Sequence, residues 1–279
     1  MDTMDAPDKA TVSADWEGRA PYWNKWADRI ADLVDRFNAP LLDAAALAPG
    51  HRVLDLASGT GEPALSAARR VAPNGHVTAT DLVPAMLAGA ARRARAQGLE
   101  NIAFEHADME ALPFPDRCFE RVTCRFGVMF VPDPVRAMRD ARRVLVPGGR
   151  IALMAWGPVA DTTIMAAVRD AGDAILGPQE AGQALLPFRM GEEGALSRPL
   201  AQAGFASVEE RALRFAPEID ATIPFWHPML DMTLGSRLAG ASDEMRGRLD
   251  AAVRARLEPQ RAGAVYRLNV HVRIATAEA

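Results

Sequence analysis

Strict alternation of strand-like and helix-like segments between residues 53 and 156 is the feature that most constrains the fold of this chain. Short apolar runs predict the strands Val53–Leu56, His76–Thr80, Ile102–His106, Val122–Cys124 and Ile151–Trp156. Between them, helical periodicity predicts helices at Glu62–Val71, at Pro84–Gln97 and from Asp133-Pro134 onward. Such alternation is typical of parallel βαβ units, so we predict an α/β fold with a doubly wound sheet.

The N-terminal flank has a weaker pattern. Residues 1–20 are polar without a period, and we expect them to be mobile. From about residue 21 the pattern becomes helical, with Ile30, Leu33, Val34 and Phe37 on one face. Pro40 is expected to interrupt this helix. We therefore predict an N-terminal helical segment over residues 1–50, followed by a domain spanning 51–279.

The C-terminal flank contains two further strand candidates. Ser207–Phe215 is one, and Val265–Ile274 alternates apolar with polar residues, which predicts a half-buried strand with one solvated face that includes His271. Two helical inserts, at about 158–200 and 217–262, are expected between the fifth strand and this last strand.

Composition excludes several functional classes. The net charge of −4 and the absence of a clustered basic region argue against a nucleic-acid partner. No apolar window reaches the ~18 residues of a membrane span. The two cysteines have the spacing of neither a metal site nor a redox pair, and no metal is expected. Together with a start that lacks an apolar signal core, these features predict a cytoplasmic protein.

A glycine turn follows the first predicted strand, in the run VLDLASGTG. Gly59 and Gly61 lack a Cβ, so the backbone can turn sharply and approach a ligand closely. In doubly wound folds a nucleotide-like ligand binds at such a turn. By itself, however, the motif fits an ordinary strand–helix turn equally well.

Two acidic residues at later strand ends make a ligand site the stronger interpretation. Asp81 ends the second strand, where a carboxylate can accept hydrogen bonds from ribose hydroxyls. Asp108 follows the third strand, where it can accept from an adenine amino group beside the backbone of Met109. A nicotinamide dinucleotide is less suitable, because Asp55 is awkward near a pyrophosphate. A small cationic ligand that carries an adenosine fits better.

At these residues the chain resembles the class I S-adenosylmethionine-dependent methyltransferases. The run VLDLASGTG and the later runs ALPFPDRCFERV, RFGVMFVPDP and VLVPGGR are similar to motifs of the type-11 and ubiquinone/menaquinone C-methyltransferase branch. The resemblance covers about a hundred residues and fades after Trp156. It implies a Rossmann-like seven-stranded sheet with the last strand antiparallel, here with helical cap insertions, and S-adenosyl-L-methionine as cofactor.

The resemblance also implies roles for individual residues. Gly59 and Gly61 would line the methionine part of the cofactor, Asp55 would lie near its amino group, and Arg125 would contact it through its backbone. Aromatic residues of the N-terminal helix would either cover the sulfonium or simply pack against the sheet. The expected cofactor-binding residues are Trp23, Trp26, Asp55, Ser58, Gly59, Thr60, Gly61, Asp81, Leu82, Met86, Asp108, Met109 and Arg125.

For the acceptor side, the second insert contains one titratable residue among large apolar ones. His227 is therefore the candidate catalytic base, with Phe126, Phe225, Trp226 and Met229 as substrate-binding residues. The alternative is that this segment forms the core of the insert itself. The remaining histidines are expected to be structural or at the surface.

These observations favour a methyltransferase that acts on a small, mostly apolar or aromatic metabolite at an oxygen, carbon or nitrogen atom. The alternatives are an NAD(P)-dependent oxidoreductase and a non-catalytic cofactor-binding module. The expected partner is a small-molecule methyl acceptor, and a homodimer is allowed for.

Overall fold

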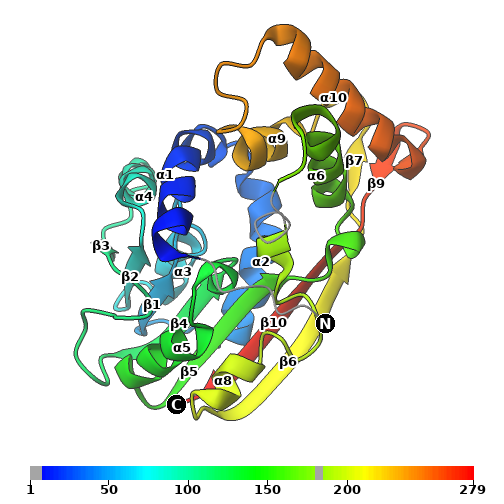
Figure 1. The fold of residues 1–279 in the computed structure, drawn as a ribbon. Helices are drawn as coiled ribbons and strands as arrows, with labels where there is room; N and C mark the ends of the chain where they lie inside the picture. The colour runs from blue at the N-terminus through cyan, green and yellow to red at the C-terminus, as the bar shows by residue number, and fades with distance from the viewer. Residues whose placement is uncertain (1–7, 180–184) are drawn as a thin grey trace.

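A seven-stranded sheet organises the chain, whose computed structural model describes residues 8–179 and 185–279, with only the backbone of 31–34. Its strand order is β3-β2-β1-β4-β5-β10-β6, as the ribbon of Figure 1 shows. Strand β10 runs antiparallel to β5 and β6, whereas the other neighbouring strands are parallel. The strands are β1 (Arg52–Leu56), β2 (His76–Asp81), β3 (Ile102–His106), β4 (Phe119–Arg125), β5 (Leu145–Trp156), β6 (Ala206–Phe215) and β10 (Val270–Glu278). The predicted fold class is confirmed.

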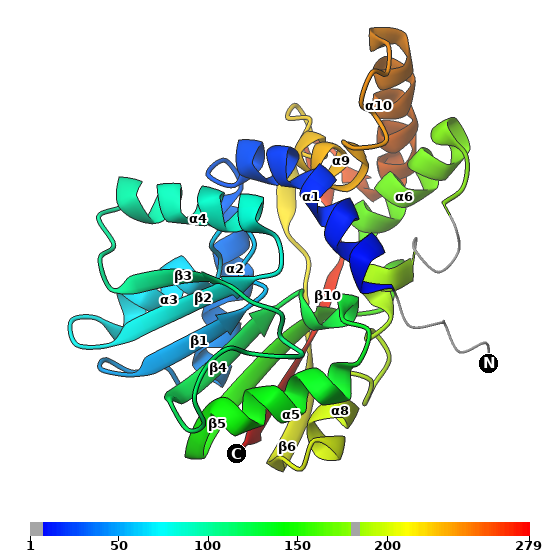
Figure 2. The same cartoon turned by 60° about the vertical axis from the view of Figure 1, so that its left-hand side comes forward.

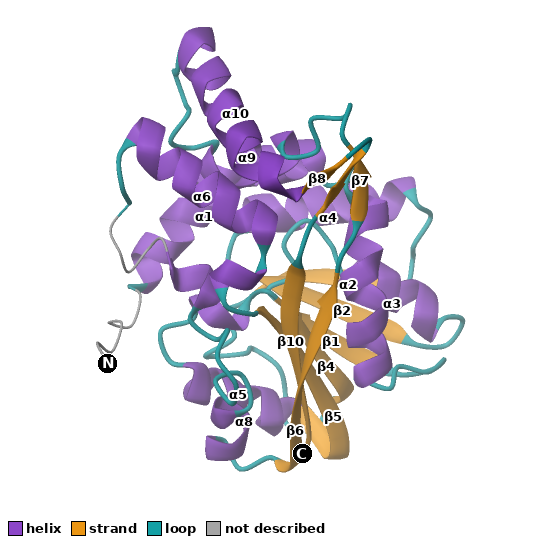
Figure 3. Ribbon diagram, turned by 90° about the vertical axis from the view of Figure 1, so that its right-hand side faces the viewer, coloured by secondary structure: helices purple, strands orange, loops and turns teal. Residues whose placement is uncertain are grey.

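Helices cover both faces of this sheet, so its central strands are buried and apolar (Figures 2 and 3). One face carries α2 (Ala31–Ala44) and α3 (Ala64–Val71), and the other carries α5 (Pro134–Val144) and α8 (Arg198–Gln202). Helix α4 (Pro84–Ala96) contacts β2 and β3. Helix α5 begins at the predicted Asp133-Pro134 pair, because the Asp133 side chain accepts a hydrogen bond from the Arg136 amide.

The expectation of mobile residues at the N-terminus is wrong from residue 8 onward, and residues 1–7 lie outside the described part. Helix α1 (Lys9–Trp26) begins there, because the Asp8 side chain accepts from the Thr11 amide. The helix is held by tertiary contacts with α4 and α9 rather than by a continuous apolar stripe. Figure 2 shows α1 lying across the top of the sheet, between α4 and α6.

Helix α2 is not interrupted at Pro40, although Pro40 lacks an amide hydrogen. The helix continues to Ala44 because Phe37, Leu41 and Leu42 are buried against the sheet. This apolar packing offsets the one backbone hydrogen bond that proline removes.

The last predicted strand is corrected in two ways. Val265–Arg267 is a separate strand, β9, and β10 is buried on both faces instead of half solvated. His271 is only 1% exposed, with its Nδ1 2.8 Å from Asp161 Oδ2. The prediction of a solvated His271 fails because the chain after β5 and the loop around Gly191 cover this face.

A cap built from both inserts lies beyond one edge of the sheet (Figure 1). It contains α6 (Thr163–Leu176), α9 (His227–Leu234) and α10 (Asp243–Leu257), as the helical prediction required. It also contains a small sheet that the sequence did not indicate: β7 (Glu218–Asp220), β8 (Arg261–Ala262) and β9. Short 3-10 turns lie at Val128–Phe130, Val159–Asp161, Leu186–Phe188 and Glu258–Gln260. Within the described ranges, no helix combines the length and apolarity needed to cross a membrane.

Candidate functional site

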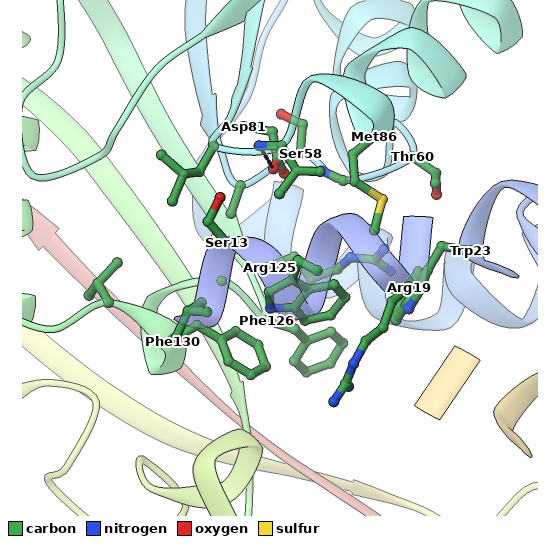
Figure 4. A pocket seen from close by; sticks show the side chains of 18 of the residues that line it. Ser13, Arg19, Trp23, Ser58, Thr60, Asp81, Met86, Arg125, Phe126 and Phe130 are labelled. Atoms are coloured by element: carbon green, nitrogen blue, oxygen red, sulfur yellow. Dashed lines mark hydrogen bonds between the residues drawn. The ribbon is translucent and has the colours of Figure 1, made fainter. Parts of the chain in front are cut away.

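A cavity of about 210 Å³ lies at the carboxyl ends of the parallel strands, beneath α1 (Figure 4). This is the edge at which open α/β sheets bind their ligands. Loops after β1, β2, β3 and β4 form its floor, and α6 and α9 contribute its wall toward the cap. The expected site residues that line it are Trp23, Ser58, Gly59, Thr60, Asp81, Leu82, Met86, Asp108, Met109, Arg125, Phe126 and Met229.

The glycine turn after β1 requires both of its glycines. Gly59 has a φ of +53° and Gly61 a φ of +113°, conformations that other residues rarely adopt. A Cβ on Gly61 would lie 2.9 Å from a Leu65 side-chain carbon, so this glycine also allows the turn to pack on α3. Gly59 faces the cavity and Gly61 does not, so the expectation that Gly61 lines the ligand site is corrected.

Asp81 connects the glycine turn to the end of β2. Its Oδ2 accepts from the Gly59 amide at 2.8 Å, and its Oδ1 accepts from the Val83 amide at 2.9 Å. Burial raises the pKa of this carboxyl above its usual value, while the two amides oppose that shift. Each oxygen keeps a second lone pair, so the carboxylate can still accept hydrogen bonds from hydroxyls in the cavity.

Asp108 follows β3, the strand next to β2, and is joined to α1. Its Oδ1 accepts from the Glu110 amide at 2.9 Å, and its Oδ2 lies 2.6 Å from Lys9 Nζ. Lys9 also pairs with the Glu110 carboxylate, and both carboxylates raise the pKa of Lys9. Lys9 is not among the predicted site residues, because a lysine in a polar segment carries no sign of a partner about a hundred residues away.

Asp55 does not reach the cavity, contrary to the expectation that it contacts a ligand amino group. Its side chain is fully buried below the glycine turn, where Thr123 Oγ1 donates to its Oδ1 at 2.6 Å. Its Oδ2 has no partner among the described residues. Burial raises the pKa of this carboxyl to about 7. Asp55 therefore supports the turn from beneath.

Arg125 lines the cavity, and Figure 4 draws its side chain there, whereas the resemblance implied a contact through its backbone. One guanidinium nitrogen donates to the Glu62 carbonyl oxygen at 3.1 Å. Burial lowers the pKa of Arg125 to about 10, so the group remains charged at neutral pH.

Aromatic rings form the part of the cavity beyond β4. Phe126 and Trp156 stack with centroids 4.1 Å apart and planes 3° apart, and Trp16 of α1 meets Phe130 edge to face at 5.1 Å. Trp156, Trp16 and Phe130 were not predicted. The position of Trp156 at the end of the fifth strand was the available signal for that residue.

Four expected site residues lie elsewhere, which corrects their assignment. Trp26 donates from its indole nitrogen to Asp231, and Phe225 packs in the cap against Trp226 and Tyr266. His227 lies in a separate groove of the cap, with its Nε2 2.8 Å from Asp250 Oδ1. The prediction that His227 and Trp226 face the cavity is therefore wrong. Helix α9 instead turns Met229 and Met232 toward it.

Comparison with known proteins agrees with this geometry. Residues 53–149 match the family described as a methyltransferase domain. This part of the chain is thus similar to methyltransferase domains. The match includes the glycine turn, Asp81, Asp108 and Arg125, and the family recognised from the sequence is confirmed.

Two relatives with known names align with about half of this chain. The demethylmenaquinone methyltransferase of Thermus thermophilus is 44% identical over 128 residues, which are 46% of this chain and 56% of that protein. The ubiquinone/menaquinone biosynthesis C-methyltransferase of Shewanella frigidimarina is 35% identical over 155 residues, 54% of this chain and 62% of that protein. The chain thus aligns with less than two thirds of either relative.

A solved structure extends the likeness in fold to nearly the whole chain. The [4+2]-cyclase SpnF superimposes with a TM-score of 0.61 over 98% of this chain and 97% of that one, at 22% sequence identity. At this identity the likeness concerns the fold, and a shared fold does not imply a shared reaction.

Proposed function

We propose that this protein is an S-adenosyl-L-methionine-dependent methyltransferase that acts on a small, mostly apolar or aromatic acceptor. The observation that carries the proposal is a single cavity with two chemically different halves. Acidic residues at the ends of β2 and β3 suit an adenosine, and a group of aromatic rings beyond β4 suits a planar acceptor.

The residues present fit this cofactor. Asp81 and Asp108 each present a carboxylate to the cavity, for the ribose and the adenine amino group respectively. The backbone of Ser58, Gly59 and Thr60 borders the space between them and Arg125, and Gly59 leaves that space open because no atom lies within 4 Å of a Cβ built there. When bound, the cofactor supplies a methyl group on a positively charged sulfur.

The protein residues contribute to the transfer by positioning the acceptor against the cofactor. The stacked pair Phe126 and Trp156 offers a flat surface against which an aromatic acceptor can stack. Helix α1 and the methionines Met165, Met229 and Met232 surround the acceptor and exclude water. Holding two reactants in line contributes on the order of 7–11 kcal/mol to a transfer reaction.

The cavity favours acceptors that need no strong protein base. Among its described lining residues there is no histidine, cysteine or tyrosine. The carboxylate of Glu62 accepts from Asn38 and Ser66, and that of Asp108 pairs with Lys9. Acceptors whose nucleophilic atom already has an available electron pair therefore suit this site best.

The alternatives are less compatible with the structure. A nicotinamide enzyme of this fold binds its dinucleotide across two similar halves, but here the antiparallel β10 and the strand β6 complete the sheet after β5. A non-catalytic module would bind the cofactor without transfer to any acceptor. A quinone acceptor is not implied by the two relatives, because the cap that borders the cavity lies outside the matched family region. The cytoplasmic location, the absence of a nucleic-acid partner and the homodimer remain predictions.

Titration calorimetry tests the proposal. We expect S-adenosylmethionine and S-adenosylhomocysteine to bind and NADH not to bind. Asp81→Ala should weaken binding about ten- to a hundredfold, because hydrogen bonds to a charged group contribute roughly 1.5–3 kcal/mol. Asp116→Ala is the matched control, since the Asp116 side chain is 70% exposed and pairs with Arg143 outside the cavity. Binding of NADH alone would overturn the proposal, and cofactor binding without turnover on an acceptor panel would favour the non-catalytic module.

A further inference from the structure

Three cationic side chains of the described residues line the cavity, and they differ in their partners. Lys9 pairs with Asp108 and Glu110, and Arg19 pairs with Asp15 at 2.8 Å. No ion pair joins Arg125 to a carboxylate among the side chains described, which exclude those of residues 1–7, 31–34 and 180–184.

The surroundings of Arg125 leave part of its hydrogen-bonding capacity unused. Its contact with Glu62 is to the backbone carbonyl. Of the Glu62 carboxylate, Oε2 accepts from Asn38 and Ser66, each at 2.8 Å, and Oε1 pairs with Arg93 at 3.6 Å. The Nε of Arg125 is buried and has no partner among the described residues. A desolvated cation with an unused donor favours an anionic ligand.

The strand order places Arg125 at one end of a row of ligand-binding groups. Neighbouring strands β3, β2, β1 and β4 end in or before Asp108, Asp81, the glycine turn and Arg125. A ligand with its adenine at Asp108 and its ribose at Asp81 therefore extends past the glycine turn toward Arg125. Arg125 and Arg19 are both labelled in Figure 4, where Arg19 extends to the side away from Asp81.

We propose that the Arg125 side chain binds the carboxylate at the methionine end of the cofactor. This inference rests on the function proposed above. The sulfonium and the amino group are both cationic, so the carboxylate is the one part of that end that attracts a guanidinium. A neutral residue at position 125 should thus cost the cofactor its carboxylate contact while the adenosine contacts remain.

The test compares two ligands that differ only in this carboxylate: S-adenosylhomocysteine and its decarboxylated analogue, which keeps the amino group. By titration calorimetry, the wild-type protein should prefer S-adenosylhomocysteine about ten- to a hundredfold. Arg125→Met should bind both ligands with equal affinity, near that of the wild-type protein for the decarboxylated analogue. Arg125→Lys should retain part of the preference, because it keeps the charge but loses the two-pronged geometry.

Arg189→Met is the matched control. Arg189 also has a pKa lowered by burial, an Nε without a partner among the described residues and a hydrogen bond to a backbone carbonyl, that of Val131, but it does not line the cavity. The Arg189→Met variant should prefer S-adenosylhomocysteine over the decarboxylated analogue as strongly as the wild-type protein does. An undiminished preference in Arg125→Met and Arg125→Lys would overturn the inference, as would loss of the preference in Arg19→Met alone. If the wild-type protein binds neither ligand, the proposed function itself is wrong.

Discussion

Two buried carboxylates at neighbouring strand ends show how position within a few ångströms decides the role of a residue. Asp55 and Asp81 lie on β1 and β2, and both were candidates for ligand contact. Asp81 is 9% exposed and borders the cavity, whereas Asp55 is fully enclosed and its Oδ2 is without a partner among the described residues. Asp81 can serve a ligand, and Asp55 is an ionisable group inside the core.

Asp55 should therefore make stability depend on pH. Burial raises its pKa from 3.8 to about 7 in the folded protein, so the folded state holds a proton that the unfolded state releases between these values. The free energy of unfolding should fall as pH rises through this window, by at most about 1.4 kcal/mol per pH unit, and level off above it. In Asp55→Asn, the part of the fall in unfolding free energy with pH that is due to residue 55 should disappear. Urea unfolding of both proteins at pH 5, 6 and 8 measures it, and parallel pH profiles would contradict the assignment.

At the scale of elements, α1 decides whether the cavity is closed. Its N-terminal end is joined to the floor by Lys9, and its other end is joined to α9, where Trp23 Nε1 donates to the Met232 carbonyl at 3.2 Å. The helix contacts α4 as well. Since these contacts come from separate parts of the chain, the roof of the site is a product of tertiary packing.

Loss of the Lys9 contacts should loosen α1 selectively. In Lys9→Met, the α1 amides should exchange with deuterium up to about fivefold faster, because partly exposed ion pairs contribute about 0–1 kcal/mol. Hydrogen exchange followed by mass spectrometry measures this, and α10 is the internal control, because the Lys9 side chain pairs with Asp108 and Glu110. Equal exchange of α1 in both proteins would show that the helix is held by its other contacts alone.

At the scale of the whole molecule, the cap has its own apolar core and only borders the cavity. Trp226 is 2% exposed and packs in that core with Leu230, Val253 and Tyr266, and its indole nitrogen donates to Asp250 at 2.7 Å. The adjacent His227 side chain is 46% exposed and shares this carboxylate from the groove side. Trp226 thus has a structural role, and His227 lies at the surface of the cap.

Two substitutions in the cap distinguish a structural role from a catalytic one. Trp226→Ala should lower the free energy of unfolding by about 3–5 kcal/mol, the usual cost of removing a buried tryptophan side chain. His227→Ala should leave kcat unchanged, because no part of this residue lines the cavity. Thermal unfolding and turnover on an identified acceptor measure the two effects. A large drop in kcat for His227→Ala, with cofactor affinity unchanged, would reinstate His227 as a base.

The sequence by itself determined the sheet and the floor of the site. Strand and helix patterns are local, and parallel strands with helical crossovers bring their carboxyl ends to one edge, so Asp81, Asp108 and the glycine turn had to meet. Only the tertiary structure decided what covers that edge. The closure by Lys9, the orientation of Arg125, the burial of Asp55 and His271 and the exclusion of His227 all depend on contacts between distant segments, for which local periodicity carries no signal. A helix such as α9 presents several faces, and packing alone selected the one with Met229 for the cavity.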